Sequence, residues 1–310
     1  MNRSELERVV FELVEGQWGL LTAAQARAAG VSRVQLTRLA EAEVLVRLAH
    51  GVYVLRGAAS MDHLELRAAW LGLDPERMAA DRLRNPTQGA VVSHASAARL
   101  HQLGDLEADR HEFTLPMRKQ TGRSDVRLHR AVLTAGDVMT VAGLPVTRPE
   151  RIIVDLLADR HDGEQVARVL ASAVRSREID LEQLAPLLSP FSARFGLPAA
   201  EGGLVLEYLL ELGGVADQVI ADDLVRAARA NNMDVVEMVG MFGAWFPSPA
   251  ALKLMHKWSA PSPATAALMQ KLSDLSPAPP ETDQKIDISG NDERSSGNPR
   301  SDDEIEGLRV

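Results

Sequence analysis

The sequence contains no cysteine among its 310 residues. This absence excludes a disulfide framework, a thiolate zinc site and a thiol nucleophile. No apolar run reaches the length that crosses a bilayer. The first helix-like stretch carries Glu5, Glu7 and Glu12, whereas a secretory signal has a basic start followed by an apolar core. We therefore expect a cytoplasmic protein with no membrane partner.

Several motifs of common enzymes are missing as well. No glycine is followed by lysine, which excludes a P-loop, and Gly-x-Gly-x-x-Gly, His-Glu-x-x-His and Gly-x-Ser-x-Gly do not occur. The Glu-x-Lys pair of many metal-dependent nucleases is absent, and so is the Gly-Ser with Asp-x-Asp of nucleotidyltransferases. We therefore expect no catalytic residues, no metal, no cofactor and no enzymatic activity.

The net charge of -9 argues against nucleic acid only at first sight. Residues 281–310 hold nine acidic and four basic residues, so more than half of the net charge lies in this segment. Because DNA is bound by a local basic face, the total charge of the chain does not decide the question.

The pattern of apolar residues, turns and charges predicts an α+β protein of four parts. These are a winged helix-turn-helix at 1–56, a mixed α/β domain at 57–185, a helical region at 186–275 and a disordered acidic tail at 276–310. Strands are expected near 91–92, 113–115, 126–128, 138–141 and 144–146, and helices at 164–176, 204–212, 219–230 and 235–246. The tail is rich in Pro, Ser, Asn, Gly and acids, and cannot bury enough apolar surface to offset its ordering entropy.

The first 56 residues predict three short helices followed by a hairpin. Three capping-box pairs mark the helix starts: Ser4 with Glu7, Thr22 with Gln25, and Ser32 with Gln35. Two β-rich runs around the turn at 49–51 indicate the hairpin. Only Gly30 and Val31 separate the second helix from the third, which is the tight turn of a helix-turn-helix.

The third helix is the best candidate for reading DNA, because in this motif its N-terminal half enters the major groove. Arginine pairs with guanine edges and glutamine with adenine edges. Residues at the start of the second helix are expected to approach phosphate, and those of the hairpin to contact the backbone or minor groove. The expected DNA-binding residues are Thr22, Gln25, Ser32, Arg33, Gln35, Thr37, Arg38, Arg47, His50 and Tyr53.

A second basic cluster follows the expected strand at 113–115. It consists of Arg118, Lys119, Arg123, Arg127 and Arg130, opposed only by Asp125. It is either a patch for nucleic acid or an acidic partner, or a solvated charged loop.

The histidines and acids of the central region suggest no site. His94 and His101 are seven residues apart on one helix, roughly 10 Å, which is too far to share a metal ion. Both are expected to be ordinary surface or core-edge residues. Asp155, Asp159 and His161 are close in sequence, but nothing marks them as a catalytic set.

The chain resembles the AbiEi antitoxins of type IV toxin–antitoxin systems. The run from 20 to 55, which ends in Gly-Val-Tyr-Val-Leu, resembles their winged-helix domain. The central motifs Val-Ser-His-Ala-Ser-Ala-Ala at 92–98, Leu-His-Arg at 128–130 and Gly-Leu-Pro-Val-Thr at 143–147 support this, and the likeness covers residues 5–185. It implies an autorepressor that binds inverted repeats in its own promoter as double-stranded operator DNA and counteracts an AbiEii-type nucleotidyltransferase toxin.

Three alternatives remain open at this stage. The winged helix could target a nuclease-like enzyme to nucleic acid, or the chain could be a one-component regulator without a toxin. The third is a protein-interaction module that uses the apolar stripe of Met238, Met241, Phe242, Trp245, Phe246 and Trp258, although such a stripe is more often core. The sequence leaves the oligomeric state open.

Overall fold

A computed structural model describes residues 2–230 of the chain. These residues fall within one unit that ends at residue 233. No helix among them is long and apolar enough to span a membrane. The expected helix at 235–246, the apolar stripe that begins at Met238 and the acidic tail at 276–310 lie outside the described residues.

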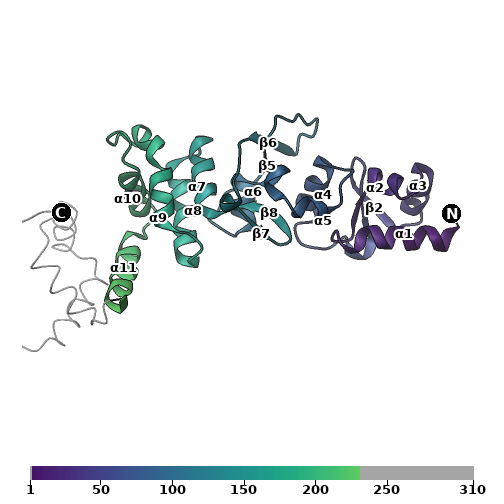
Figure 1. Ribbon diagram of the computed structural model, residues 1–310, viewed down its shortest axis with the longest axis horizontal. Helices are drawn as coiled ribbons and strands as arrows, with labels where there is room; N and C mark the ends of the chain where they lie inside the picture. The colour runs from purple at the N-terminus through teal and green to yellow at the C-terminus, as the bar shows by residue number, and fades with distance from the viewer. Residues whose placement is uncertain (1, 231–310) are drawn as a thin grey trace, which may run out of the picture. The chain divides into compact units, whose positions relative to one another are not determined.

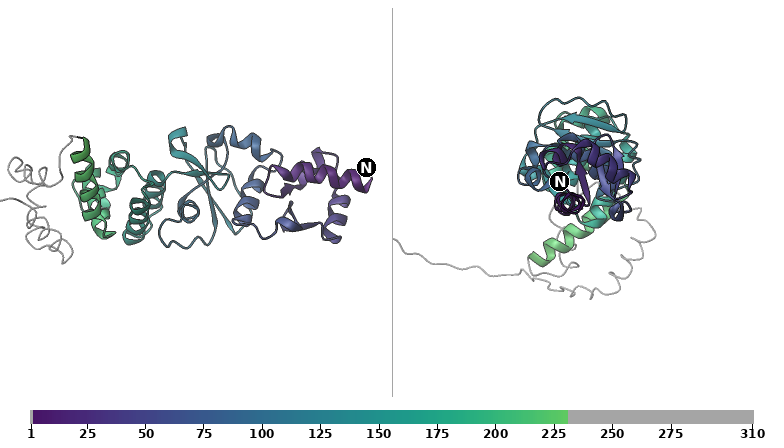
Figure 2. Two further views of the ribbon diagram at one scale, coloured as in Figure 1. Left: turned by 90° about the horizontal axis from the view of Figure 1, so that it is seen from below. Right: turned by 90° about the vertical axis from the view of Figure 1, so that its right-hand side faces the viewer.

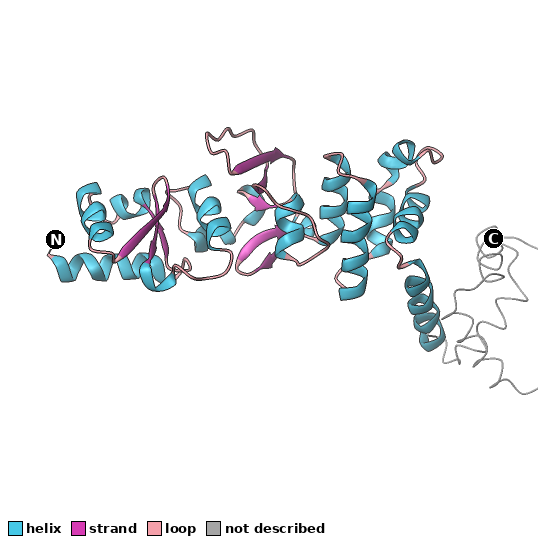
Figure 3. Ribbon diagram, turned by 180° about the vertical axis from the view of Figure 1, so that it is seen from behind, coloured by secondary structure: helices cyan, strands magenta, loops and turns pink. Residues whose placement is uncertain are grey.

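The first 55 residues alternate helices with a small antiparallel sheet. The elements are α1 (Arg3–Glu15), β1 (Leu20–Thr22), α2 (Ala23–Ala28), α3 (Arg33–Glu41), β2 (Leu45–Ala49) and β3 (Val52–Leu55). The strands have the order β1-β3-β2, so the expected hairpin is confirmed and the short β1 adds a third strand to it. Figure 3 shows this sheet apart from the larger one of the chain.

Two of the three expected capping boxes are confirmed and one is wrong. Thr22 caps α2 and Ser32 caps α3, each with a reciprocal bond to the glutamine three residues later. In α1, Asn2 and Glu5 form the box in place of Ser4 and Glu7. Both pairs have the residue types of a capping box, and the helix begins at the earlier of the two.

A small core holds these helices against the sheet. Leu6, Val10 and Val14 of α1 lie on one face and pack with Leu36 and Leu39 of α3. Leu21 and Leu45 from the strands complete this cluster together with Ala26 and Val31. This core fixes the orientation of α3, and with it the face that α3 leaves exposed.

A five-stranded mixed sheet forms the centre of the chain. It follows α4 (Leu64–Leu73) and α5 (Ala79–Leu83) and comprises β4 (Val91–Val92), β5 (His111–Leu115), β6 (Val126–Arg130), β7 (Val138–Val141) and β8 (Leu144–Thr147), with α6 (His94–Leu100) between β4 and β5. The order is β6-β5-β4-β8-β7; β4 runs parallel to β8 and β5 to β6, while the other pairs are antiparallel. All five expected strands are confirmed, and the described residues have the mixed α+β composition that the sequence predicts.

Helices follow the sheet. They are α7 (Pro149–Ala158), α8 (Gly163–Ser176), α9 (Leu181–Leu187), α10 (Gly202–Leu212) and α11 (Ala216–Ala230), with the 3-10 helix η4 (Ser189–Phe195) between α9 and α10. α10 packs against α8, α9 and η4, and α7 packs against both α6 and α8 (Figures 1 and 2). The helices expected at 164–176, 204–212 and 219–230 are confirmed. The division into four domains stays a prediction.

Candidate nucleic-acid interface

The turn between α2 and α3 is tight and well defined. Gly30 has a φ of +84°, the left-handed conformation that glycine adopts without strain. Its N–H donates to Arg27 O, and the Val31 N–H donates to Ala26 O, which together form a Schellman motif. Val31 is buried. The turn therefore anchors the start of α3 to the core.

One continuous arc of α3 remains exposed. Arg33, Val34, Thr37 and Arg38 are exposed, and at 3.6 residues per turn they span about 140° of the helix circumference. Leu36 and Leu39 occupy the opposite side and are buried. In residues 2–230, neither Arg33 nor Arg38 forms an ion pair, so both guanidinium groups are available to an external acceptor.

The β2–β3 hairpin presents a second pair of polar side chains. Arg47 and His50 are exposed, and Arg47 Nη2 lies 3.3 Å from His50 Nδ1. Because a guanidinium can only donate, His50 Nδ1 is the acceptor and the neutral ring carries its proton on Nε2. Tyr53, the cross-strand partner of Arg47, is only half exposed and packs against the core of α1 and α3.

Two of the expected DNA-binding residues are instead structural. Thr22 and Gln25 are buried, with exposed fractions of 0% and 2%. The Thr22 hydroxyl donates to Pro75 O, and Gln25 Nε2 donates to Arg77 O at 2.8 Å. The expectation that they approach phosphate is wrong, because a capping box turned inward leaves no polar atom for a ligand.

Ser32 and Gln35 are also occupied by their capping box, although they lie near the surface. Gln35 Oε1 accepts from the Ser32 N–H at 2.8 Å, and Ser32 Oγ accepts from the Gln35 N–H at 3.3 Å. Gln35 is only half exposed, at the edge of the exposed arc. The candidate interface therefore consists mainly of the four exposed residues of the arc, rather than of Ser32 and Gln35.

The sequence analysis did not include two exposed side chains, one on this arc and one on α2. Val34 is 60% exposed on α3, and an apolar side chain there suits the methyl group of thymine. Arg27 is exposed at the end of α2 and forms no ion pair within the described part of the chain. Val34 could have been identified from the sequence, because the helical repeat places it between Arg33 and Arg38 around the helix axis.

The second basic cluster is largely engaged within the protein. Lys119 Nζ donates to Leu73 O, Arg123 forms a bidentate pair with Asp125, and Arg127 binds Asp159 at 2.7 Å. Arg118 and Arg130 are exposed and form no ion pair among residues 2–230. The five residues therefore do not offer five free charges to a ligand.

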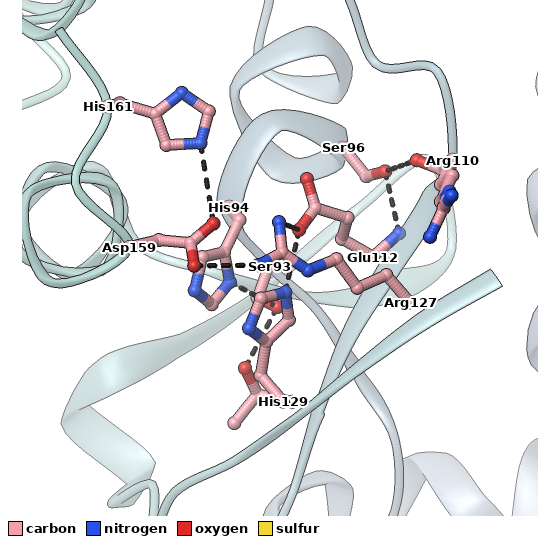
Figure 4. A network of polar contacts seen from close by, with 10 residues as sticks. Ser93, His94, Ser96, Arg110, Glu112, Arg127, His129, Asp159 and His161 are labelled. Carbon is pink, nitrogen blue, oxygen red and sulfur yellow. Dashed lines mark hydrogen bonds and ion pairs between the residues drawn. The ribbon is translucent and has the colours of Figure 1, made fainter. Parts of the chain in front are cut away.

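A buried polar cluster joins α6 to β5 and β6, and the sequence reasoning missed it. His94 is buried, not a surface residue, and its ring stacks on that of His129 with centroids 3.5 Å apart. His129 Nε2 lies 2.6 Å from Glu112 Oε2, and Arg127 links Glu112 to Asp159 (Figure 4). The sequence contained one indication of this cluster. Glu112 and Thr114 are two residues apart on β5, and Arg127 and His129 are two residues apart on β6, which places all four on one face of the strands.

Burial changes the ionisation of this region. Desolvation, aided by the neighbouring charges of His129 and Arg127, lowers the pKa of His94 to about 2, so the ring is neutral. Burial also raises the pKa of Asp155 to about 6 despite its ion pair with Arg151. Asp155 and Asp159 bind different arginines, Arg151 and Arg127, and therefore do not form one catalytic set.

Comparison with known proteins gives two family matches. Residues 8–56 match a family described as "Transcriptional regulator, AbiEi antitoxin", and residues 89–196 match one described as "AbiEi antitoxin C-terminal domain". A comparison with curated proteins finds no match. Among solved structures, the RV2827C protein from Mycobacterium tuberculosis is similar at 23% identity, with a TM-score of 0.43, over 70% of this chain and 80% of that one.

Proposed function

The chain belongs to the AbiEi antitoxins, and from this premise we propose that it represses its own operon by binding inverted repeats of double-stranded operator DNA. The matched descriptions are those of an antitoxin and a transcriptional regulator, and the N-terminal match covers α2, α3 and the whole hairpin. The proposed role is carried by α3 and the hairpin, and it requires no enzymatic activity. Such a repressor acts in the cytoplasm, where the operator is.

We propose that residues 1–56 form a winged helix-turn-helix with α3 as the recognition helix. The order of three helices and a hairpin supports this, as does the four-residue turn from α2 to α3. The observation that carries the proposal is the exposed arc of α3, which holds Arg33 and Arg38 without ion pairs in the described residues. A single arginine side chain of this kind can donate two hydrogen bonds to one guanine, at O6 and N7.

The hairpin would act as the wing. Arg47 and the Nε2–H of His50 are donors at its exposed edge, and donors of this kind suit phosphate oxygens or a minor groove. Tyr53 would support the wing from the core side. Val34 and Thr37 would complete the readout on α3 through apolar contact and a hydroxyl.

A gel shift with the DNA upstream of the operon tests this role. We expect a discrete complex that an excess of a scrambled duplex does not displace, and that weakens steeply with salt because counterions are released from phosphate. Equal affinity for the scrambled duplex would contradict sequence-specific repression.

We further propose that the protein counteracts a nucleotidyltransferase toxin of the AbiEii type encoded beside it. The antitoxin families support a toxin partner. Expression of the neighbouring nucleotidyltransferase should arrest growth, and co-expression of this chain from an unrelated promoter should restore it. Failure of this rescue together with intact operator binding would identify a one-component regulator.

A further inference from the structure

Three side chains with metal-ligand atoms meet where α6 covers β5 and β6. His94 is the first residue of α6, Glu112 lies on β5 and His129 on β6. One ligand atom from each lies within 4.8 Å of the other two. His94 and Glu112 are 5% and 6% exposed, and Figure 4 shows the two rings and the carboxylate facing one another.

We propose that His94, Glu112 and His129 bind one divalent transition-metal ion of the zinc class. Two imidazoles and one carboxylate are a ligand set that zinc accepts, with the fourth position of the tetrahedron left for water or another ligand. Magnesium and calcium require mostly oxygen ligands, so a set with two nitrogens disfavours them. The site shares no residue with α3 or the hairpin, so it is independent of the proposed DNA binding.

The surroundings hold the ligands in position. Ser93 Oγ lies 3.0 Å from His94 Nδ1 and accepts from the Thr114 hydroxyl at 2.8 Å, which fixes the ring of His94 at one nitrogen. His94 Nε2 has no hydrogen-bond partner within residues 2–230. When Nδ1 donates to Ser93, Nε2 keeps the lone pair that a metal ion needs.

The backbone of His94 adopts an uncommon conformation. Its φ of +54° places a residue with a side chain in the left-handed region. Such strained conformations persist where surrounding structure holds them, and they concentrate at functional sites.

Binding would rearrange two contacts within the cluster. Bonds of about 2.0–2.1 Å place tetrahedral ligand atoms roughly 3.3 Å apart. The ion would therefore replace the 2.6 Å bond between His129 and Glu112, and the rings, now 13° from parallel, would tilt out of their stack. Arg127 would remain bound to Asp159, which balances its charge, so Glu112 is the carboxylate that offsets part of the charge of the ion.

The experiment uses the full-length chain, freed of metal by chelation and dialysis. Zinc chloride is titrated in by calorimetry, and metal retained after gel filtration is counted by mass spectrometry. We expect one zinc ion per chain and a thermal unfolding midpoint that rises with zinc concentration, because an ion that binds only the folded state stabilises it. Magnesium should produce neither effect.

Variants assign the ion to the cluster. His129→Gln and Glu112→Gln should each weaken zinc binding at least tenfold, whereas His101→Gln, which replaces another largely buried histidine adjoining α6, should bind as the wild type does. If the variants do not fold, cobalt substitution of the wild type should give the intense visible absorption of tetrahedral nitrogen and oxygen ligation. Absence of stoichiometric zinc in the wild type, zinc binding unchanged in both folded variants, or an octahedral cobalt spectrum would overturn the proposal.

Discussion

Gln17 and Gln25 exchange a reciprocal pair of side-chain amide hydrogen bonds, at 3.0 and 3.1 Å. Both are buried. Gln17 Oε1 also accepts from the Ala79 N–H, and Gln25 Nε2 donates to Arg77 O. The amide pair therefore ties the turn after α1 and the start of α2 to the first residue of α5 and the segment before it.

Replacing Gln25 with alanine should destabilise the fold. The change leaves Arg77 O and the Thr22 N–H without their buried partner, and each such group costs about 1–3 kcal/mol. Urea unfolding measures the free energy. Gln120→Ala is the matched control, since Gln120 is exposed on a loop and its loss should change stability by less than about 0.5 kcal/mol. Equal stability of the two variants would show that the amide pair contributes nothing.

Gly143→Ala should destabilise the central sheet. Ala142 and Gly143 form the two-residue turn between β7 and β8, with φ values of +50° and +80°. A Cβ on Gly143 would lie 2.9 Å from Trp18 Nε1. Overpacking costs about 1–3 kcal/mol, and the left-handed backbone adds roughly 1–2 kcal/mol for a residue with a side chain.

Gly122→Ala is the control for this change. Nothing lies within 4 Å of a Cβ at Gly122, and its φ is not positive. Thermal unfolding compares the two variants with the wild type. A midpoint for Gly143→Ala as high as that of Gly122→Ala would contradict the close approach of Trp18.

His101 should make part of the stability depend on pH. Burial lowers the pKa of His101, although the contacts with Thr147 O, Glu178 and Glu150 oppose this shift. The unfolded ring gains its proton near pH 6.5 and the folded ring only at lower pH. The contribution of His101 to stability is therefore fully present above pH 6.5 and is lost as pH falls below it.

Urea unfolding at pH 7 and pH 5 tests this dependence. His101→Gln retains a side-chain donor for Thr147 O but has no proton to gain, so its loss of stability between the two values should be smaller than that of the wild type. Some dependence should remain, because burial also lowers the pKa of His94 and of His111. The same loss in both proteins would show that the burial of His101 does not affect its titration.

Arg47→Ala should weaken DNA binding by a similar factor for specific and scrambled duplexes. If Arg47 contacts phosphate, its loss reduces the slope of log affinity against log salt by about 1. Affinities measured at several salt concentrations give this slope. An unchanged slope combined with altered preference among operator sequences would instead assign Arg47 to the reading of bases.

Local patterns predicted much of the fold. Short apolar runs identified all five strands of the central sheet, and capping residues located the starts of α2 and α3. Helix α4 was not anticipated, because Leu66, Ala68, Ala69, Trp70 and Leu71 are all buried and the helix has little amphipathic contrast. The start of α1 was placed two residues late because two capping pairs overlap.

The candidate sites were less predictable, because they depend on contacts distant in sequence. Thr22 and Gln25 have the residue types of phosphate contacts, yet their partners Pro75 and Arg77 lie some 50 residues away and turn them inward. His94 and His129 come together only through the pairing of β5 with β6 and the packing of α6. The alternation of residues along β5 and β6 places Glu112 and His129 on one face of their strands, but it does not show that His94 packs against that face.

The affinity for upstream DNA of a protein that carries both Arg33→Ala and Arg38→Ala tests the central claim most directly. Fluorescence anisotropy with a labelled operator duplex should show a loss of at least about thirtyfold, because each lost base contact costs about 1–3 kcal/mol. The control carries Arg84→Ala and Arg168→Ala, which remove two positive charges from exposed ion pairs elsewhere, and should bind within about threefold of the wild type. A folded Arg33→Ala, Arg38→Ala protein that binds the operator as tightly as the wild type would contradict the assignment of α3 as the recognition helix.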